Sequence, residues 1–336
     1  MKNAYKHNLA GGFAVLLMAA VLTAAAGCAK TKKAEEKDGG AKAVLRIGAQ
    51  PFPLYSSILV AHNLGFLDEE LNKVNAGYVW TSFNSGPLVN EAVASGNADI
   101  GFMADMPAII ARSVGQDIQI VGHVGYGERA LALIVKTGSP IKSLAEIKGK
   151  KIAFVKGSYA QHLLALLLES AGLTFKDIES VNIGAGDMPA ALEAGQIDGA
   201  VIWEQYISAL VETGRARVLA DGTGIKRGNM VTYAVRSYAE AHPEVIAAYL
   251  RAGQRGSDYI KSNPKEAAAA IAPDLKLDGA LVEKIFTKFD FYQNLTPADI
   301  EEIGRVKDYI LKEKIISNDI SIEDFITTRY IKEAGL

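Results

Sequence analysis

The chain has 336 residues, of which 49% are hydrophobic and 22% are charged. This length exceeds one ordinary hydrophobic core and suits two. The formal net charge of −2 lacks the basic excess of a general nucleic-acid binder, so no nucleic-acid partner is expected. A single cysteine excludes an internal disulfide framework and cysteine-based zinc sites, and the fold must therefore depend on its apolar core.

The N-terminal segment predicts a secretory signal peptide over residues 1–27. A basic stretch, Met1–Asn8, precedes an uncharged run that ends in small residues just before Cys28. The run is long enough for a transmembrane anchor, but Gly11-Gly12 interrupts it and alanine dominates it, which favours a cleaved signal. A buried structural cysteine is the other alternative for Cys28.

Cys28 at the end of this run resembles the bacterial lipoprotein signal. In that signal the thiol receives a diacylglycerol and becomes the mature N-terminus. The resemblance implies a lipid on Cys28, membrane anchoring, and a location in the periplasm or at the cell surface. Residues 28–42 contain no large apolar side chain and predict a flexible tether. A polybasic membrane patch is the alternative, but Glu35, Glu36 and Asp38 offset the lysines.

From Val44 onward, short β-rich runs alternate with helical stretches, which predicts α/β lobes with mainly parallel sheets. A first unit extends to residue 121 and a second to residue 235. Beyond Pro243 the pattern is almost wholly helical. The predicted strands are 44–48, 78–83, 100–103, 118–121, 130–135, 151–155, 181–183, 199–202 and 231–235. The predicted helices are 55–64, 87–94, 107–114, 159–171 and 189–194.

Two segments resemble each other at an offset of 99 residues. Residues 92–101 and 191–200 each read as a helix end, a capping glycine (Gly96, Gly195) and an aspartate (Asp99, Asp198) just before a buried strand. A helix–Gly–x–x–Asp–strand connection is common, so chance similarity is one explanation. Together with the repeated alternation, it favours two similarly built lobes.

Catalytic signatures are scarce. The sequence has no His-Glu-x-x-His, Cys-x-x-Cys, Gly-x-Ser-x-Gly or phosphate-binding glycine loop, and its histidines are scattered. No enzyme activity, metal or cofactor is expected.

Strand–loop–helix starts recur instead. Ser85, Asp105 and Ser158 each stand at the beginning of a predicted helix. Exposed N–H groups and the positive end of the helix dipole make such starts suitable for anions. Ligands of open α/β sheets lie beyond the carboxyl ends of the strands, where these loops fall. Ordinary helix capping is the alternative for any single start. Trp203-Glu204 and Phe52 to Tyr55 could add a cleft wall or pack in the core.

These residues resemble the periplasmic solute-binding proteins for aliphatic sulfonates, taurine and nitrate. The resemblance extends from about Leu45 to about Leu250. It is carried by Arg46-Ile47-Gly48-Ala49-Gln50, Ser85-Gly86-Pro87, Asp105-Met106-Pro107-Ala108, Ser139-Pro140-Ile141, Lys148–Ala153, Lys156-Gly157-Ser158 and Asp198–Glu204.

The resemblance implies a two-lobed α/β type II periplasmic-binding-protein fold with a two-strand hinge. The strand crossovers then fall near Tyr126–Arg129 and near Arg236–Ser237. Lobe one comprises 43–127 and 237–336, and lobe two comprises 128–236. The implied ligand-binding residues are Gln50, Tyr55, Ser85, Gly86, Asp105, Met106, Arg129, Ser158, Tyr159, Trp203 and Glu204. A carboxylate such as Asp105 is compatible with an anionic ligand only if it caps its own helix; otherwise it would contact an amine of the ligand. Arg129 is the residue expected to supply positive charge.

The sequence is thus interpreted as a lipid-anchored, monomeric binding subunit of an ABC importer. Its expected partners are a permease and the ATPase of that permease, and its expected ligand is a small organic anion of the sulfonate type. Nitrate, bicarbonate or a thiamine-pyrimidine-like heterocycle remain alternative ligands. An enzyme on the same fold, such as a thiamine-pyrimidine synthase relative, would carry a cysteine-rich segment that is absent here. A sensor input domain would need a signalling module and a retained membrane helix.

Overall fold

A computed structural model describes residues 42–336. The predicted signal peptide (1–27), Cys28 and all of the predicted tether except Lys42 lie outside the described residues. Within residues 42–336, no helix is both long and apolar enough to cross a membrane.

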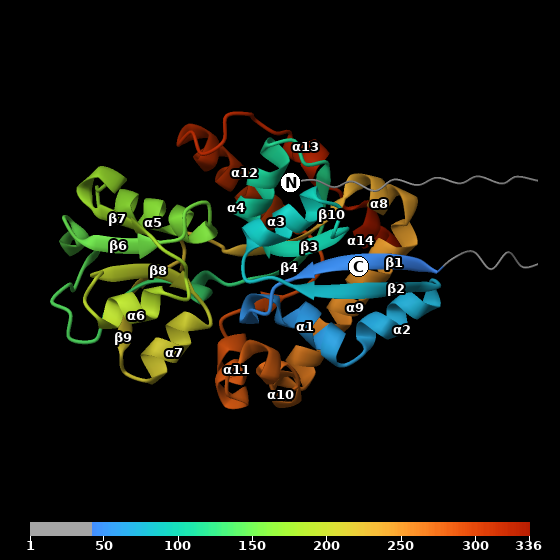
Figure 1. Ribbon diagram of the computed structural model, residues 1–336, viewed down its shortest axis with the longest axis horizontal. Coiled ribbons are helices and arrows are strands. Elements are labelled where there is room, and N and C mark those ends of the chain that lie inside the picture. Colours follow the sequence, from blue (N-terminus) through green and yellow to red (C-terminus); the bar gives the residue numbers. More distant parts are fainter. Residues whose placement is uncertain (1–41) are drawn as a thin grey trace, which may run out of the picture. The chain divides into compact units, whose positions relative to one another are not determined.

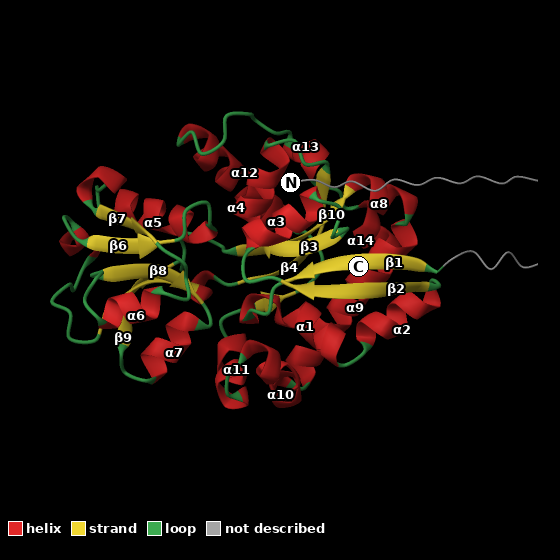
Figure 2. Cartoon of the chain, viewed as in Figure 1, coloured by secondary structure: helices red, strands yellow, loops and turns green. Residues whose placement is uncertain are grey.

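Two β-sheets organise the described chain, and Figures 1 and 2 show helices packed around each. The first sheet has the strand order β11-β4-β10-β3-β1-β2, and the second has the order β7-β6-β8-β5-β9. We call the two halves lobe one and lobe two. This architecture confirms the predicted two-lobed α/β class. The strands are β1 (Ala43–Ala49), β2 (Ala76–Ser82), β3 (Ile100–Ala104), β4 (Ile118–Tyr126), β5 (Leu131–Lys136), β6 (Lys151–Phe154), β7 (Glu179–Asn182), β8 (Gly199–Trp203), β9 (Ala216–Asp221), β10 (Asn229–Val235) and β11 (Asp290–Phe291).

Helices follow most strands and form the whole C-terminal part apart from β11. The strand β3 is buried at every position, which is typical of an apolar run in the middle of a sheet covered on both faces. The helices are α1 (Ser56–Asn63), α2 (Phe66–Lys73), α3 (Gly86–Ala94), α4 (Asp105–Ser113), α5 (Tyr159–Ser170), α6 (Met188–Glu193), α7 (Tyr206–Glu212), α8 (Arg236–Ala241), α9 (Pro243–Ser262), α10 (Pro264–Leu275), α11 (Gly279–Phe286), α12 (Pro297–Lys312), α13 (Ile322–Phe325) and α14 (Arg329–Ala334).

The two sheets share one plan in which the chain crosses between them twice. Each has three parallel strands (β2-β1-β3 and β7-β6-β8) followed by an antiparallel strand, β10 or β5, that enters from the other lobe. The first crossing lies between β4 and β5, over residues 127–130. The second lies between β9 and β10, over residues 222–228.

The predicted position of the second crossing, near Arg236–Ser237, is wrong. The strand β10 pairs with β3 and β4 and therefore belongs to lobe one. Its apolar sequence would suit either sheet, because local pattern does not encode which neighbours a strand meets. The edge strand β9 and the helices α2 and α7 were not predicted; β9 is short and half-exposed, so its hydrophobic pattern is weak.

The internal repeat has an identical hydrogen-bonding pattern in both lobes. The Asp99 carboxylate accepts the Arg46 N–H at 2.9 Å, and the Asp198 carboxylate accepts the Lys151 N–H at 2.8 Å. The N–H of each aspartate in turn donates to the carbonyl of the same residue, Arg46 or Lys151. Each aspartate therefore joins the amino end of one strand, β3 or β8, to the neighbouring parallel strand, β1 or β6. The expectation of two similarly built lobes is confirmed at this point.

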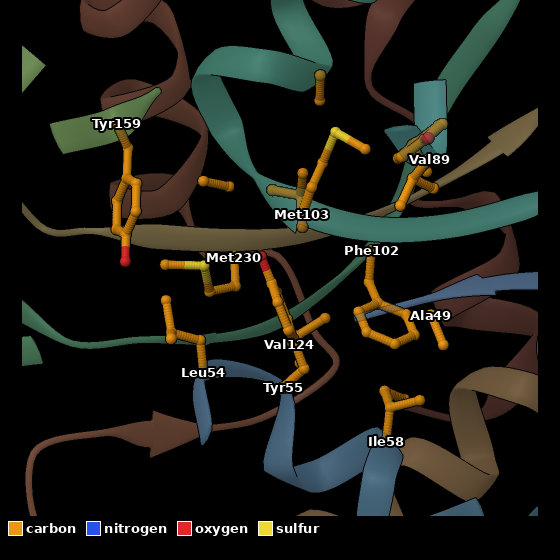
Figure 3. Packing of buried hydrophobic residues seen from close by; sticks show 14 of the residues in the cluster. Ala49, Leu54, Tyr55, Ile58, Val89, Phe102, Met103, Val124, Tyr159 and Met230 are labelled. Carbon is orange, nitrogen blue, oxygen red and sulfur yellow. The ribbon is translucent and has the colours of Figure 1, made fainter. Parts of the chain in front are cut away.

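The largest apolar cluster crosses from lobe one into lobe two. Figure 3 shows Tyr55, Phe102 and Met103 from lobe one, and Tyr159 of α5 at the left, which belongs to the same cluster. A smaller cluster around Met188 and Ile202 packs on the other side of the second sheet. The lobes therefore share apolar contacts at the place where the strands of both sheets end.

The paired turns of the repeat allow a matched stability test. Gly96 and Gly195 each adopt φ +71° with open space where a Cβ would stand, so alanine there meets backbone strain alone. We expect Gly96→Ala and Gly195→Ala each to lower the free energy of unfolding by about 1 kcal/mol. Gly304→Ala, in the interior of α12 with equal space, should raise it by about 0.5–1 kcal/mol. Urea denaturation measures all three, and equal effects at the three glycines would contradict the assignment.

Candidate functional site

A cavity that is partly open to solvent lies between the two lobes, and its enclosed volume is about 60 Å³. Its walls follow the carboxyl ends of β1, β2 and β3 in one sheet and of β6 and β8 in the other, where open α/β sheets hold ligands. It is lined by Gln50, Phe52, Leu54, Tyr55, Ser85, Gly86, Pro87, Met103, Ala104, Pro107, Val155, Lys156, Gly157, Ser158, Tyr159 and Trp203.

The structure places seven of the eleven predicted ligand-binding residues around this cavity. They are Gln50, Tyr55, Ser85, Gly86, Ser158, Tyr159 and Trp203. The other four, Asp105, Met106, Arg129 and Glu204, do not line it. Sequence reasoning quoted Phe52, Leu54 and Lys156 only as parts of motifs and did not select them as ligand residues.

Two helix N-termini from different lobes meet at the cavity. Ser85 and Ser158 are the N-cap residues of α3 and α5, and both have extended backbone. Neither hydroxyl caps its own helix, and Ser158 Oγ instead donates to the Val155 carbonyl at 2.7 Å. The first-turn N–H groups therefore have no side-chain acceptor from their own cap, while the helix dipoles add partial positive charge.

Buried phenols supply further hydrogen-bonding groups. The Tyr159 hydroxyl is buried and has no hydrogen-bond partner among the described residues. Burial raises the pKa of both Tyr159 and Tyr55 well above the usual value, so each stays a neutral phenol that can donate. The Tyr159 ring packs beside Trp203 with centroids 5.6 Å apart. A ligand oxygen in the cavity would satisfy the Tyr159 hydroxyl.

Gln50 lines the cavity from the loop after β1. Its side-chain amide donates to the Phe102 carbonyl at 2.7 Å, which fixes the side chain and leaves its oxygen for other contacts. Gln50 is 3% exposed. This position confirms that the residue lies at the cavity, whereas its contact with a ligand stays a prediction.

Asp105 begins α4 and is wholly buried, without lining the cavity. One carboxylate oxygen accepts the Met106 N–H at 2.7 Å, and the other lies 3.8 Å from Nζ of Lys226, a buried residue of the second crossing. Lys226 also bonds Glu302 of α12 at 3.2 Å. Asp105 and Met106 are both wholly buried and do not line the cavity, so their contact with a ligand stays a prediction.

Glu204 is likewise occupied by a lysine. Its carboxylate accepts the Ser208 N–H at 3.1 Å and the Ser208 hydroxyl at 3.0 Å, and it forms an ion pair with Lys288 of lobe one. Glu204 is fully buried but does not line the cavity. Its pairing with Lys288 joins the two lobes, and its predicted contact with a ligand stays a prediction.

Arg129, the cation that the sequence favoured, does not line the cavity. It is exposed in the first crossing and donates to the Thr287 carbonyl at 2.7 Å. Lys156 is the only charged residue among the described residues that line the cavity. Its N–H donates to Asn182, while its ammonium has no ion-pair partner within residues 42–336. Its place directly after β6 and before Gly157-Ser158 is the sequence signal that could have identified it.

The arrangement is suited to holding an anion with an apolar group attached. It combines helix N-termini, a neutral phenol and one ammonium with apolar walls from Phe52, Leu54 and Met103. Within the part of the chain that the structure describes, no cluster of three or more His, Cys, Asp or Glu is placed to hold a metal ion.

Known proteins resemble this chain over most of its length. The family described as NMT1/THI5 like matches residues 55–267. A protein of Escherichia coli (strain K12) named for binding aliphatic sulfonates is 32% identical over 238 residues, which cover 71% of this chain and 73% of that protein. The solved structure of the alkanesulfonate-binding protein SsuA from Xanthomonas axonopodis pv. citri, bound to MOPS, has a TM-score of 0.77 and 27% identity and covers 85% of this chain and 98% of that chain.

A relative of another class also matches. The 4-amino-5-hydroxymethyl-2-methylpyrimidine phosphate synthase of Legionella pneumophila is 26% identical over 294 residues, which cover 84% of this chain and 89% of that enzyme.

The two carboxylates around Lys226 should affect stability with opposite signs as pH changes. Burial raises the pKa of Asp105 to about 6 from an ordinary 3.8 despite the opposing charge of Lys226. The protonated form is therefore the stabilising one, and its contribution is lost as pH rises from about 4 through about 6. Burial also acts to raise the pKa of Glu302, but Lys226 and Arg305 outweigh it and hold the pKa below its usual value. The contribution of Glu302 is thus lost as pH falls.

As the pH rises from 4 to 7, the free energy of unfolding of Asp105→Asn should increase by about 2 kcal/mol relative to that of the wild type. Over the same rise in pH, the free energy of unfolding of Glu302→Gln should fall relative to that of the wild type. Urea denaturation at stepped pH measures both differences. Parallel curves for the wild type and Asp105→Asn would contradict the raised pKa of Asp105.

Proposed function

This chain belongs to the NMT1/THI5-like family, and from that premise we propose that it is the substrate-binding component of an ABC importer that captures a small organic sulfonate. The protein would bind its ligand between the lobes and present the closed form to a permease and its ATPase. Binding, rather than catalysis, is the task proposed for the site.

The observation that carries this proposal is the meeting of two helix N-termini from different lobes at one cavity. A sulfonate has three oxygens and one negative charge. The N–H groups of α3 and α5, the unpartnered Tyr159 hydroxyl and the Lys156 ammonium offer donors for such a group. Because the donors come from both lobes, the ligand would favour closure of the cleft.

The apolar walls support an organic anion over the alternatives. Nitrate and bicarbonate have no apolar part to pack against Phe52, Leu54 and Trp203. A pyrimidine could stack on Trp203, but it would leave the donors of the helix starts without an anionic acceptor. Catalysis has less support, since no carboxylate, histidine or cysteine is among the described residues that line the cavity.

We further propose that the protein is anchored at the periplasmic or cell-surface side of a membrane by a lipid on Cys28. This rests on the signal-like segment before Cys28. An anchor would hold the receptor close to its permease and raise its effective concentration there. The binding lobes would act as a monomer.

Ligand binding can be tested by removing the Tyr159 hydroxyl. The full chain, purified in detergent, should show a higher melting temperature with ethanesulfonate, and Tyr159→Phe should weaken binding about tenfold by removing one hydrogen bond to a charged group. Tyr249→Phe is the control, because Tyr249 is buried but does not line the cavity. Calorimetry supplies the affinities. If nitrate or a pyrimidine binds while sulfonates do not, the proposed ligand class fails.

Lipid anchoring has its own test in a bacterial host. The wild-type protein should sediment with membranes and show the added mass of a lipid, whereas Cys28→Ala should lose both. Because Cys28 is the only cysteine, mass spectrometry of the N-terminal peptide is unambiguous. A wild-type protein without lipid, or a Cys28→Ala variant retained equally well in membranes, would refute the anchor.

A further inference from the structure

We propose that Lys288 is a positioning residue that holds the two lobes together in the conformation that binds ligand. Lys288 belongs to lobe one and forms its ion pair with Glu204 of lobe two. We call this pair the latch. Its effect on affinity rests on the proposed binding function, whereas its effect on the lobes does not.

Lys288 lies in a short segment of lobe one, residues 287–291, that runs along the first crossing. This segment includes β11, which pairs with β4, and the carbonyl of Thr287 accepts a hydrogen bond from Arg129 at 2.7 Å. Between these contacts the two segments approach closely, because a Cβ on Gly127 would stand only 2.8 Å from the Lys288 carbonyl oxygen. The backbone of Lys288 is therefore fixed beside the point where the chain passes between the lobes.

The ammonium of Lys288 contacts two acceptors in lobe two. It pairs with the Glu204 carboxylate and lies 3.0 Å from the Ser208 hydroxyl oxygen. Within residues 42–336, Lys288 is the only cation that pairs with Glu204. The Glu204 side chain is fully buried, whereas that of Lys288 is 22% exposed. The buried carboxylate thus depends on a cation that the other lobe supplies.

This dependence couples the latch to the position of the lobes. With the lobes together and Lys288 absent, Glu204 would be a buried charge without compensation, which is strongly unfavourable. Moving the lobes apart would let water reach the side of the carboxylate that Lys288 covers. Removing Lys288 should therefore favour separated lobes.

The same carboxylate lies close to the cavity. Glu204 directly follows Trp203, which lines the cavity. Burial, the neighbouring Tyr55 and then the charge of Glu204 raise the pKa of Tyr159, another lining residue. An anion in the cavity would be repelled by an unpaired Glu204. Lys288 therefore favours an anionic ligand in two ways, by holding the lobes together and by offsetting this charge.

A neighbouring lysine provides a matched control. Lys284, within α11, also pairs across the lobes, with Glu212 of α7, but the two side chains are 57% and 44% exposed. Exposed ion pairs contribute little because water screens them. The two lysines thus join the same lobes and differ in the burial of their carboxylate partners.

The distance between the lobes gives the first test. In the full chain carrying Cys28→Ala, in detergent, Lys265→Cys on α10 and Ala190→Cys on α6 place one spin label at an exposed position of each lobe. Double electron–electron resonance without added ligand should give one predominant distance. Lys288→Met should add a second population, and Lys284→Met should not. Identical distributions for Lys288→Met and the labelled parent would refute the latch.

Calorimetry with ethanesulfonate gives the second test, on the full chain in detergent. Apparent affinity falls in proportion to the population of the binding conformation. We therefore expect Lys288→Met to weaken binding about tenfold and Lys284→Met to change it less than twofold. Adding Glu204→Gln to Lys288→Met should weaken binding no further, because the charge that needs the lysine is then absent. A further large loss in this double variant would contradict the pairing of the two residues.

Circular dichroism checks the fold of each variant. If Lys288→Met does not fold, Glu204→Gln carries the distance test, because it removes the same ion pair while its side-chain oxygen can still accept from Ser208. It should likewise add the second population.

The latch and the proposed function fail in different ways. If Lys288→Met changes neither the distances nor the affinity, the latch is refuted and sulfonate binding stands. If the wild type binds nitrate or a pyrimidine but no sulfonate, the proposed function is refuted, and the distances still decide on the latch.

Discussion

Two buried carboxylates, each paired with a lysine, determine much of the electrostatics around the cavity. A buried carboxylate without a partner is strongly unfavourable, so Asp105 and Glu204 each require a cation. Lys226 meets Asp105 from the second crossing, and Lys288 meets Glu204 from the other lobe. These pairs offset two negative charges that lie next to the cavity-lining Tyr159, and they also join chain segments that are distant in sequence. The electrostatics of the site therefore depend on how the lobes are joined.

The same pairing bears on motion between the lobes. Lys284, within α11 of lobe one, pairs with Glu212 of lobe two, and Lys288, just after α11, pairs with Glu204. The His162 ring of α5 also stacks on the Tyr309 ring of α12, with the ring centroids 4.3 Å apart. Opening the cleft must separate these contacts along with the apolar surfaces around Tyr159. A ligand bound by donors of both lobes adds to an interface that already exists, so it needs to supply only part of the free energy of closure.

The sequence was sufficient to predict the fold class and much of the cavity, but not the charges. Alternation of strands and helices is local, and the loops after parallel strands gather at one edge, so Ser85, Ser158 and Trp203 could be placed at the cavity, while their contact with a ligand stays a prediction. Partner choice is not local: nothing near Asp105 or Glu204 in the sequence indicates a lysine more than 80 residues away. The same limit explains why β10 was assigned to the wrong lobe and why Arg129 was preferred to Lys156. The resemblance to periplasmic solute-binding proteins supplied the order of the motifs and was confirmed.

The internal repeat shows where the two lobes are alike and where they differ. At the amino ends of the strands, Asp99 and Asp198 make the same hydrogen bonds, and this end lies away from the cavity. At the carboxyl ends the lobes differ: lobe one presents the start of α3, which follows its edge strand β2, whereas lobe two presents the start of α5, which follows the inner strand β6. A pair of identical lobes would surround a ligand symmetrically. Here the charged residue Lys156 stands on one side alone, so the cavity is polarised and a ligand with one anionic end has a preferred orientation.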